Sequence, residues 1–470
     1  MEWMTTIMAM KFELALTAIV FILLFLKIDG RAGNESVIRF TNLLLLLNLA
    51  LGFVWNKDAQ LFGEMFKSNG LLAIEKNVLN LATLIISLFS YEWLKKHKHV
   101  SEFYLLMLSS LLGLFFMLSS GNLLMFYLGL ELSTIPLAAL CNFDLEKKAS
   151  GEAALKMILS SAFSSAILLF GISLVYGSCG TVNFSEIAMN LSGGKMQMLA
   201  LIIVFTGFAF KLSVVPFHLW TADVYEGSPV AVTAYLSVVS KGAMAFAFIS
   251  TFYTAFGNMA ITWFYLLAFG AAVSMLVGNL FAMRQTNLKR FLAFSSIAQV
   301  GYLLIGISSI TAAGVASVVY FVLIYVFSNL AAFGVVSVIA SLTGRETIDE
   351  YKGLYKTNPS LALILALALF SLAGIPPTAG FFGKLFLLTT GAAMGQWWLI
   401  IFASLNLIIS LYYYLRIVRA MFVDESSEPL TKLSLNNPAF IALVLCVLGI
   451  VVTGFVGKTF DVIFEMAAKM

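Results

Sequence analysis

Two stretches of this sequence decide its fold: GFAFKLSVVPFHLW (residues 207–220) and FSLAGIPPTAGFFGKLFLL (residues 370–388). Each is an apolar run interrupted by glycine or proline, and each carries a lone lysine, Lys211 or Lys384. Membrane helices tolerate proline, so one such run would be weak evidence. Two broken helices that each carry a lysine are typical of the paired interruptions at transport sites.

The composition of the whole chain indicates a membrane protein. Its 470 residues are 61% hydrophobic and only 11% charged, whereas soluble domains carry roughly 25% charged residues. The three cysteines are scattered without metal-ligand spacing, and no nucleotide-binding motif is present, so the sequence offers no site for a flavin, an iron–sulfur cluster or a metal. The net charge of +4 lies mostly in short loops, where it sets topology, so it does not indicate nucleic-acid binding.

Fourteen apolar segments approach the length of about 20 residues that a membrane helix needs. They lie near residues 11–27, 38–55, 77–94, 102–119, 121–140, 152–176, 197–216, 229–252, 260–283, 288–308, 312–342, 360–391, 396–420 and 437–457. The connection 56–76 is mildly polar and has room for a short hairpin or an interfacial element. The sequence therefore predicts an all-α integral membrane protein with about fourteen transmembrane helices, of which helices 7 and 12 are broken.

The basic residues are concentrated in every second connection between the expected helices. Seventeen lie in the odd-numbered connections: Lys27, Arg31, Arg39, Lys95, Lys96, Lys98, Lys147, Lys148, Arg284, Lys289, Arg290, Arg345, Lys352, Lys356, Arg416, Arg419 and Lys432. The even-numbered connections hold four: Lys57, Lys67, Lys76 and Lys195. Because cytoplasmic loops are enriched in Lys and Arg, this bias predicts a multi-pass protein of a bacterial inner membrane with both termini on the periplasmic side.

The two broken helices lie five helices apart, which predicts an internal repeat. If helices 4–8 and 9–13 are two five-helix units, the odd number inverts one unit relative to the other. We therefore expect four parts. These are an N-terminal three-helix region (1–100), a first repeat (101–255), a second, inverted repeat (256–425) and a C-terminal helix (426–470).

Four charged residues lie inside expected membrane helices: Glu131, Lys211, Lys241 and Lys384. Each costs about 2.5–3.5 kcal/mol at a helix centre. Glu131 can pair with one lysine for structural reasons alone, which leaves at least two lysines without a permanent acidic partner. Burial makes such a lysine release its proton more readily, and a carboxylate that approaches or withdraws switches its proton affinity. We therefore predict that these four residues translocate protons.

Two further residues are weaker candidates for the same role. Lys156 lies early in helix 6, where it can also extend to the interface, and His218 follows the proline of helix 7. Other polar residues can bridge the charged sites or simply pack helices. They are Ser213, Ser237, Ser240, Ser295, Ser296, Gln299, Tyr302, Tyr325, Ser328 and Asn329.

Three long motifs resemble the antiporter-like membrane subunits of respiratory complex I. They are GFAFKLSVVPFHLWTADVYEGSPVAVTAYLSVVSK (207–241), LGLELSTIPL (128–137) and NLKRFLAFSSIAQVGY (287–302). The resemblance is strong from about residue 122 to 420, and three features favour one branch of the family. They are the phrase WTADVYEGSP (220–229), a lysine at position 384 where another branch has glutamate, and no long lateral helix after helix 14. Ala222 departs from the proline that is usual before Asp223.

The resemblance implies that Glu131 modulates Lys211, that Lys241 and Lys384 relay the proton, and that Lys156 and His218 occupy positions the family commonly fills this way. It further implies that this chain binds no cofactor, while NADH, FMN, iron–sulfur clusters and quinone belong to partner subunits. The implied partners are other membrane-arm subunits, including antiporter-like ones, and the lipid bilayer. A subunit of a multi-chain cation/proton antiporter or of a membrane-bound hydrogenase shares these features and remains the alternative, as does an inert membrane scaffold.

Overall fold

The computed structural model describes residues 2–54 and 56–469. Residue 55, the expected end of the second span, lies outside the described residues. The N-terminal helices are α1 (Glu2–Ala9), α2 (Lys11–Asp29), α3 (Asn34–Leu51), α4 (Gly70–Phe89), α5 (Tyr91–Lys96), α6 (Val100–Leu118) and α7 (Leu123–Cys141). An antiparallel hairpin, β1 (Ala59–Leu61) and β2 (Phe66–Ser68), precedes α4. It confirms that the 56–76 connection holds a short hairpin.

The remaining elements of the described chain are all helices, joined by loops. The middle helices are α8 (Lys148–Cys179), α9 (Phe184–Asn190), α10 (Lys195–Leu212), α11 (Leu219–Gly227), α12 (Val230–Tyr235), the π-helical turn η1 (Leu236–Ser240), α13 (Lys241–Ala255), η2 (Gly257–Met259), α14 (Ala260–Ala282) and α15 (Leu288–Ser308). The last are α16 (Ala312–Thr343), η3 (Ile348–Tyr351), α17 (Leu354–Thr357), α18 (Pro359–Ala373), α19 (Ala379–Ala393), α20 (Trp397–Phe422), α21 (Asn437–Phe455) and α22 (Lys458–Ala467).

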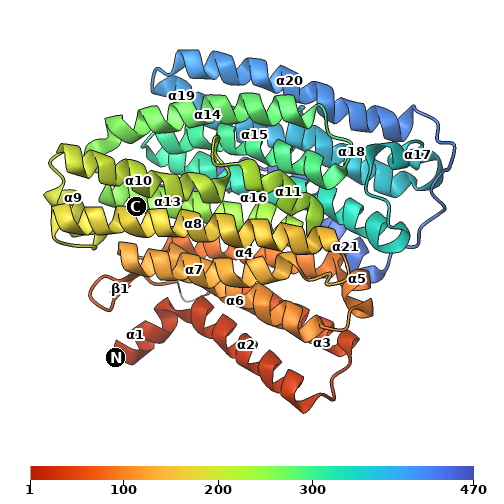
Figure 1. Ribbon diagram of the computed structural model, residues 1–470, viewed down its shortest axis with the longest axis horizontal. Coiled ribbons are helices and arrows are strands. Elements are labelled where there is room, and N and C mark those ends of the chain that lie inside the picture. The colour runs from red at the N-terminus through yellow and green to blue at the C-terminus, as the bar shows by residue number, and fades with distance from the viewer. Residues whose placement is uncertain (1, 55, 470) are drawn as a thin grey trace.

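The long helices run side by side as one bundle (Figure 1). Eleven helices of the described part are long and apolar enough to cross a membrane, or up to twelve if the bent pair α1–α2 is one span. This confirms an all-helical, multi-pass architecture. The short apolar helices α18 and α19 and the more polar α3 fall outside this count, so the total of fourteen spans remains a prediction.

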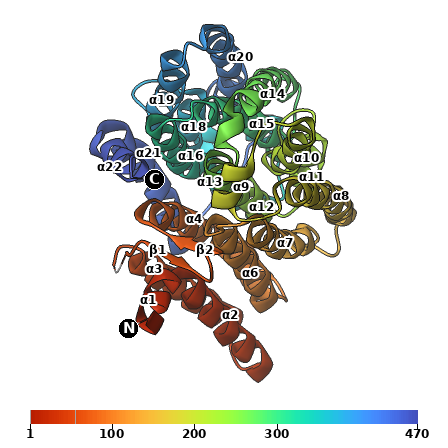
Figure 2. The same ribbon diagram turned by 90° about the vertical axis from the view of Figure 1, so that its left-hand side faces the viewer.

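Burial divides the helices into inner and outer ones. The apolar segment of α15 is buried along its whole length, and α4, α12–α13 and α16 are almost as deeply enclosed. Figure 2, which looks along the bundle, shows α16 in the middle with α15, α18 and α21 around it. The apolar segments of α8, α14 and α20 are mostly exposed, as expected for helices that face lipid or another membrane subunit.

The start of α4 corrects one expectation. The third span was predicted to begin near residue 77, with Lys76 in a connection, but α4 begins at Gly70 and Lys76 is only 1% exposed. Its ammonium lies 2.5 Å from the carboxylate of Glu13 on α2, which is equally buried. The charge of Lys76 continues into the bundle because it has this partner, and the pair joins the N-terminal helices to the core.

Candidate functional site

Lys211 lies in the last turn of α10, beside the first helix break. α10 ends because Ser213 adopts a left-handed backbone conformation, with φ of 63°. The indole of Trp220, beyond the break, donates a 3.2 Å hydrogen bond to the carbonyl of Phe210, one of the groups that the break releases. A broken helix is tolerated in a membrane only when such groups find partners. The carbonyl end of α10 also stabilises the nearby ammonium group of Lys211.

The ammonium group of Lys211 meets α7 at a hydroxyl rather than at a carboxylate. It donates a hydrogen bond to Oγ1 of Thr134, which in turn donates to the carbonyl of Leu130 at 2.6 Å. Glu131 lies three residues before Thr134 on the same face of α7, and its buried Oε1 has no hydrogen-bond partner among the described residues. The structure therefore places Glu131 near Lys211 without a direct ion pair, and Thr134 lies beside both.

Lys241 is the first residue of α13, directly after the π-helical turn η1. Such turns are common at functional sites because they alter the direction of a side chain. Lys241 is 4% exposed, donates a 2.8 Å hydrogen bond to Oγ of Ser296 on α15, and lies 5.4 Å above the ring of Tyr225. Among the described residues it is thus bound by one neutral oxygen and one aromatic face, with His218 within electrostatic range.

Lys384 lies on α19 and reaches back across the second helix break. Its ammonium group donates to the last carbonyls of α18, those of Leu372 (2.7 Å) and Ala373 (3.3 Å), and lies 4.9 Å above the ring of Tyr302. Gly374 makes this arrangement possible, because its φ of 84° suits glycine and an added Cβ would lie 3.2 Å from Cδ of Lys384. The carbonyl end of α18 thus binds the buried cation.

The buried helix α15 connects the Lys241 and Lys384 sites. Ser296 accepts a hydrogen bond from Lys241, Gln299 donates a 2.9 Å hydrogen bond to the carbonyl of Leu372, and Tyr302 lies beneath Lys384. Several of the polar residues that the sequence offered only as possible bridges therefore lie between the two lysines. Tyr225 and Tyr414 were missed, because a tyrosine inside an apolar run resembles any other packing residue; Tyr414 hydrogen-bonds to Ser295 at 2.6 Å.

The two weaker candidates differ in their surroundings: His218 lies within electrostatic range of Lys241, whereas Lys156 is held in a separate ion-pair network. Lys156 on α8 is about two-fifths exposed and forms 2.6 Å ion pairs with both Glu152 and Asp223. Asp223 in turn pairs with Arg290 at 2.6 Å, so Lys156 belongs to a network of permanent ion pairs. His218 is the N-cap residue of α11, and its buried Nδ1 has no hydrogen-bond partner among the described residues.

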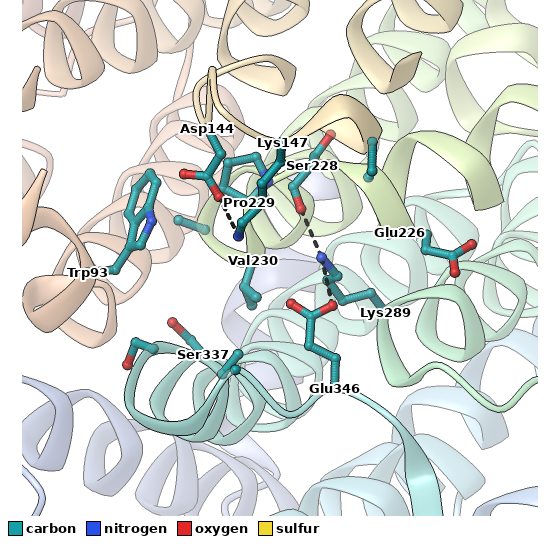
Figure 3. A pocket seen from close by; sticks show the side chains of 16 residues that line it. Trp93, Asp144, Lys147, Glu226, Ser228, Pro229, Val230, Lys289, Ser337 and Glu346 are labelled. Carbon is teal, nitrogen blue, oxygen red and sulfur yellow. Dashed lines mark hydrogen bonds and ion pairs between the residues drawn. The ribbon is translucent and has the colours of Figure 1, made fainter. Parts of the chain in front are cut away.

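A cleft of about 300 Å³ opens at the start of α12, whose continuation carries Lys241. Figure 3 shows Lys289 and Glu346 pointing toward each other across it, with Ser228 close by. Nζ of Lys289 lies 3.0 Å from Oε2 of Glu346 and 3.1 Å from the carbonyl of Ser228. Several lining residues belong to connections rich in lysine and arginine, which is the side expected to face the cytoplasm. The cleft therefore gives water access to one end of the Lys241 helix.

Within residues 2–54 and 56–469, no group of three or more His, Cys, Asp and Glu side chains is arranged to hold a metal ion. The features that the structure brings together are three buried lysines, two helix breaks and a chain of hydroxyl and amide groups. These features define the class of antiporter-like membrane subunits.

Comparisons with known proteins identify the family. The family model described as NADH:quinone oxidoreductase/Mrp antiporter, transmembrane, matches residues 120–410. A protein of Phocaeicola vulgatus named NADH-quinone oxidoreductase subunit N is 44% identical over 98% of this chain and 99% of its own. A chain of respiratory complex I from Thermus thermophilus is 29% identical, with a TM-score of 0.81 over 96% of this chain and 98% of its own. The chain therefore belongs to the NADH:quinone oxidoreductase/Mrp antiporter family and, within it, to subunit N of the NADH-quinone oxidoreductases.

A chain of the Mrp complex from Dietzia has the same fold. Its TM-score is 0.86, over 98% of this chain and 97% of its own, but the sequences are only 22% identical. At that identity the likeness concerns the fold alone.

Proposed function

We propose that this chain is a proton-translocating subunit in the membrane arm of an NADH:quinone oxidoreductase. The observation that supports this proposal most strongly is that its three buried lysines have neutral hydrogen-bond partners. Lys211, Lys241 and Lys384 are at most 7% exposed, yet each donates hydrogen bonds only to neutral oxygens of the described residues. A buried ammonium group without a carboxylate is costly, and the cost falls when its proton leaves.

Two other buried lysines provide an internal contrast. Lys76 pairs with Glu13 at 2.5 Å, and Lys289 pairs with Glu346 at 3.0 Å. Each therefore has a permanent acidic partner, which favours the charged form at all times. The chain contains both kinds of buried lysine, and the unpaired kind lies along the line between the two helix breaks. This difference favours proton transfer over a purely structural role for the three unpaired lysines.

The proposed route follows that line. Glu131 modulates the proton affinity of Lys211, whose ammonium group donates a hydrogen bond to Thr134. Lys241 receives protons from the side of the 300 Å³ cleft and passes them to Lys384. Lys156 assists at most from the side, because it is held by ion pairs. His218 lies within electrostatic range of Lys241 and assists it there.

The proposal includes the predicted organisation. It comprises fourteen spans, two inverted five-helix repeats (101–255 and 256–425), an N-terminal three-helix region (1–100) and a C-terminal helix (426–470). Both termini face the periplasm of a bacterial inner membrane. The pairs α10–α11 and α18–α19 are the two broken helices, and their lysines lie before the first break and after the second.

In this proposal the redox chemistry takes place in partner subunits. NADH, FMN, iron–sulfur clusters and quinone bind there, and this chain contributes no redox centre. Other antiporter-like subunits of the membrane arm and lipid cover the exposed apolar faces of α8, α14 and α20. The energy of quinone reduction reaches this chain as a shift in buried charge, which changes the proton affinity of the lysines.

A cation/proton antiporter subunit is the second candidate, because the Dietzia Mrp chain shares the fold. The 44% identity to a subunit N over nearly the whole chain favours the oxidoreductase. Gentle purification of the tagged chain separates the two: flavin, iron–sulfur absorbance and NADH:quinone activity that co-purify support the oxidoreductase. Membrane partners without redox activity would support the antiporter.

The decisive variant is Lys241→Met in the intact complex, reconstituted into proteoliposomes. Quinone reduction and proton uptake are measured together, the latter with a pH-sensitive dye. We expect normal assembly and at least roughly a hundredfold slower proton uptake, the contribution of a positioned proton-transfer group. The matched control is the double variant Glu13→Met/Lys76→Met, which removes a buried but permanently paired lysine and should leave proton uptake intact. Normal uptake in Lys241→Met would refute the proposed function.

A further inference from the structure

A groove of about 680 Å³ lies between the end of α7 and the start of α8. Small residues of the two helices leave it hollow, and these are Ala138, Ala139, Gly151 and Ala154. Ile135 and Leu155, which also line it, are 60% and 57% exposed. On α7 the groove follows residues 135–142, about 10 Å along the helix axis. It is therefore an apolar channel on the outside of the bundle, of the width and character that suit an acyl chain.

The groove continues into a polar cleft at one end. This cleft, of about 410 Å³, lies between the connection from α5 to α6 and the loop from α7 to α8. Both hollows are lined by His99, Phe143 and Leu145. The ring of Phe143 stacks on His97, with centroids 4.6 Å apart, and packs against Trp93 at 6.0 Å. The groove and the cleft thus form one continuous surface over an aromatic floor, apolar at one end and polar at the other.

The cleft carries a positive charge. Lys147 pairs with Asp144 at 2.9 Å, whereas Lys96 and Lys98 are exposed and form no ion pair among the described residues. Glu146 is the one other acid in the lining, and it offsets only one of these two lysines. An occupant of the cleft therefore has to be anionic where it meets Lys96 and Lys98.

The two parts of this surface lie at different depths. The groove follows helices that cross the membrane, while both lysines belong to a connection rich in basic residues, which is expected at the cytoplasmic surface. Leu145, on the loop between the two parts, is 70% exposed among charged neighbours. A phospholipid supplies an acyl chain for the groove, a cover for Leu145 and a phosphate for the lysines in one molecule. A partner helix would have to place an acidic side chain at this one level of the membrane.

We propose that the groove between α7 and α8, together with the cleft at Lys96 and Lys98, is a binding site for one anionic phospholipid. The phosphate binds the two lysines, and one acyl chain lies against Ala138 and Ala154. Basic pockets of this kind at the cytoplasmic ends of membrane helices bind anionic headgroups. The inference goes beyond the proposed function and does not depend on it.

The headgroup lies beside the water-accessible cleft described above. Trp93, Asp144 and Lys147 line both clefts, and Figure 3 shows Trp93 and the Asp144–Lys147 pair along the wall of the 300 Å³ one. The bound lipid would therefore support that wall from its outer side.

The test uses the intact purified complex in detergent micelles that contain a phosphatidylglycerol with a photoreactive diazirine on one acyl chain. After irradiation the labelled residues are mapped by mass spectrometry, and the lipid concentration for half-maximal labelling is measured. We expect label within residues 135–158. Lys96→Gln/Lys98→Gln should raise the half-maximal concentration about thirtyfold, because each lysine near a headgroup contributes about a factor of five. The matched control is Arg284→Gln/Lys432→Gln, which removes two exposed basic residues from other connections of the same expected side and should leave labelling unchanged.

A second variant tests the apolar part. Ala154→Phe fills the groove and keeps both lysines, so label within residues 135–158 should be lost while assembly, measured by size exclusion, stays normal. If this variant fails to assemble, the lysine variant still decides, because its substitutions are on the surface.

Three results would overturn the proposal. The first is a phosphatidylcholine probe that labels the same residues at the same half-maximal concentration, which would indicate bulk lipid. The second is unchanged labelling in Lys96→Gln/Lys98→Gln. The third is a parent complex in which residues 135–158 take up no label and cross-link to another subunit instead, which would make the groove a protein contact. None of these measurements depends on proton uptake, so the lipid site and the proposed function are tested separately.

Discussion

The buried pair between Glu13 and Lys76 provides the sharpest test of how the N-terminal helices are held. Both side chains are 1% exposed, and their charged atoms lie 2.5 Å apart. Lys76 also donates a 2.6 Å hydrogen bond to Ser119, the residue directly after α6. Removing one partner of such a pair leaves a buried, uncompensated charge and costs about 3–5 kcal/mol. We therefore expect either single substitution by methionine to destabilise the protein by that amount.

The two single variants should differ in a predictable direction. Without Glu13, Lys76 still faces three aromatic rings, those of Phe12, Phe66 and Phe115, at 5.4–5.9 Å, and these rings favour its charge. Without Lys76, the Glu13 carboxylate retains, among the described residues, the weak 3.4 Å hydrogen bond from Ser119. Lys76→Met should therefore be the more harmful change. The double variant removes both charges and should return to within about 1–2 kcal/mol of the parent, because apolar replacement of a buried pair is close to neutral.

The assay is a double-mutant cycle on the purified, detergent-solubilised complex. Heat-induced loss of the tagged chain from the intact size-exclusion peak is compared among the parent, both single variants and the double variant. Additive losses in the double variant would contradict the argument, since the pair would then contribute no coupling energy. Equal stability of all four proteins would contradict it as well.

Three further predictions concern the rest of the chain. Gly374→Ala places a Cβ at φ of 84° and 3.2 Å from Cδ of Lys384; it should cost about 1–2 kcal/mol of thermal stability and slow proton uptake. Thr134→Val removes the hydroxyl that accepts from Lys211, so proton uptake should slow while assembly, measured by size exclusion, stays normal. Burial lowers the pKa of His97 in the loop before α6, against the opposing charge of Asp144. The folded protein therefore binds fewer protons there than the unfolded chain, and stability falls as pH drops below about 6.5. His97→Gln should show a smaller loss of thermal midpoint between pH 7.5 and 5.5, and an unchanged loss would contradict this assignment.

The sequence predicts the helices and the unpaired lysines because both depend on local pattern. A charged residue in the middle of an apolar run, such as Lys241, stands out without any knowledge of its neighbours. The two helix breaks stand out for the same reason, since glycine and proline interrupt the run itself. The roles of these residues in proton transfer are still a prediction.

The residue that each buried lysine binds could not be predicted from the sequence, because such contacts join segments that are distant along the chain. Lys211 binds Thr134, which is 77 residues away, and Lys76 binds Glu13, which is 63 residues away. Glu13 and Lys76 also lie near the ends of apolar runs, where charged residues normally reach the interface. The packing of α2 and α4 against α6 shows that this pair is buried.

The complete burial of α15 has a mechanical consequence. Ser296, Gln299 and Tyr302 project from successive turns of this one helix, and they contact Lys241, the carbonyl of Leu372 and Lys384. A densely packed helix moves as a unit, so a small rotation of α15 that lengthens the bond to Lys241 must also shift the contacts at Lys384. Both ends of the transfer step would then open or close together. In the proposed route, the two lysine sites are therefore mechanically coupled through one helix.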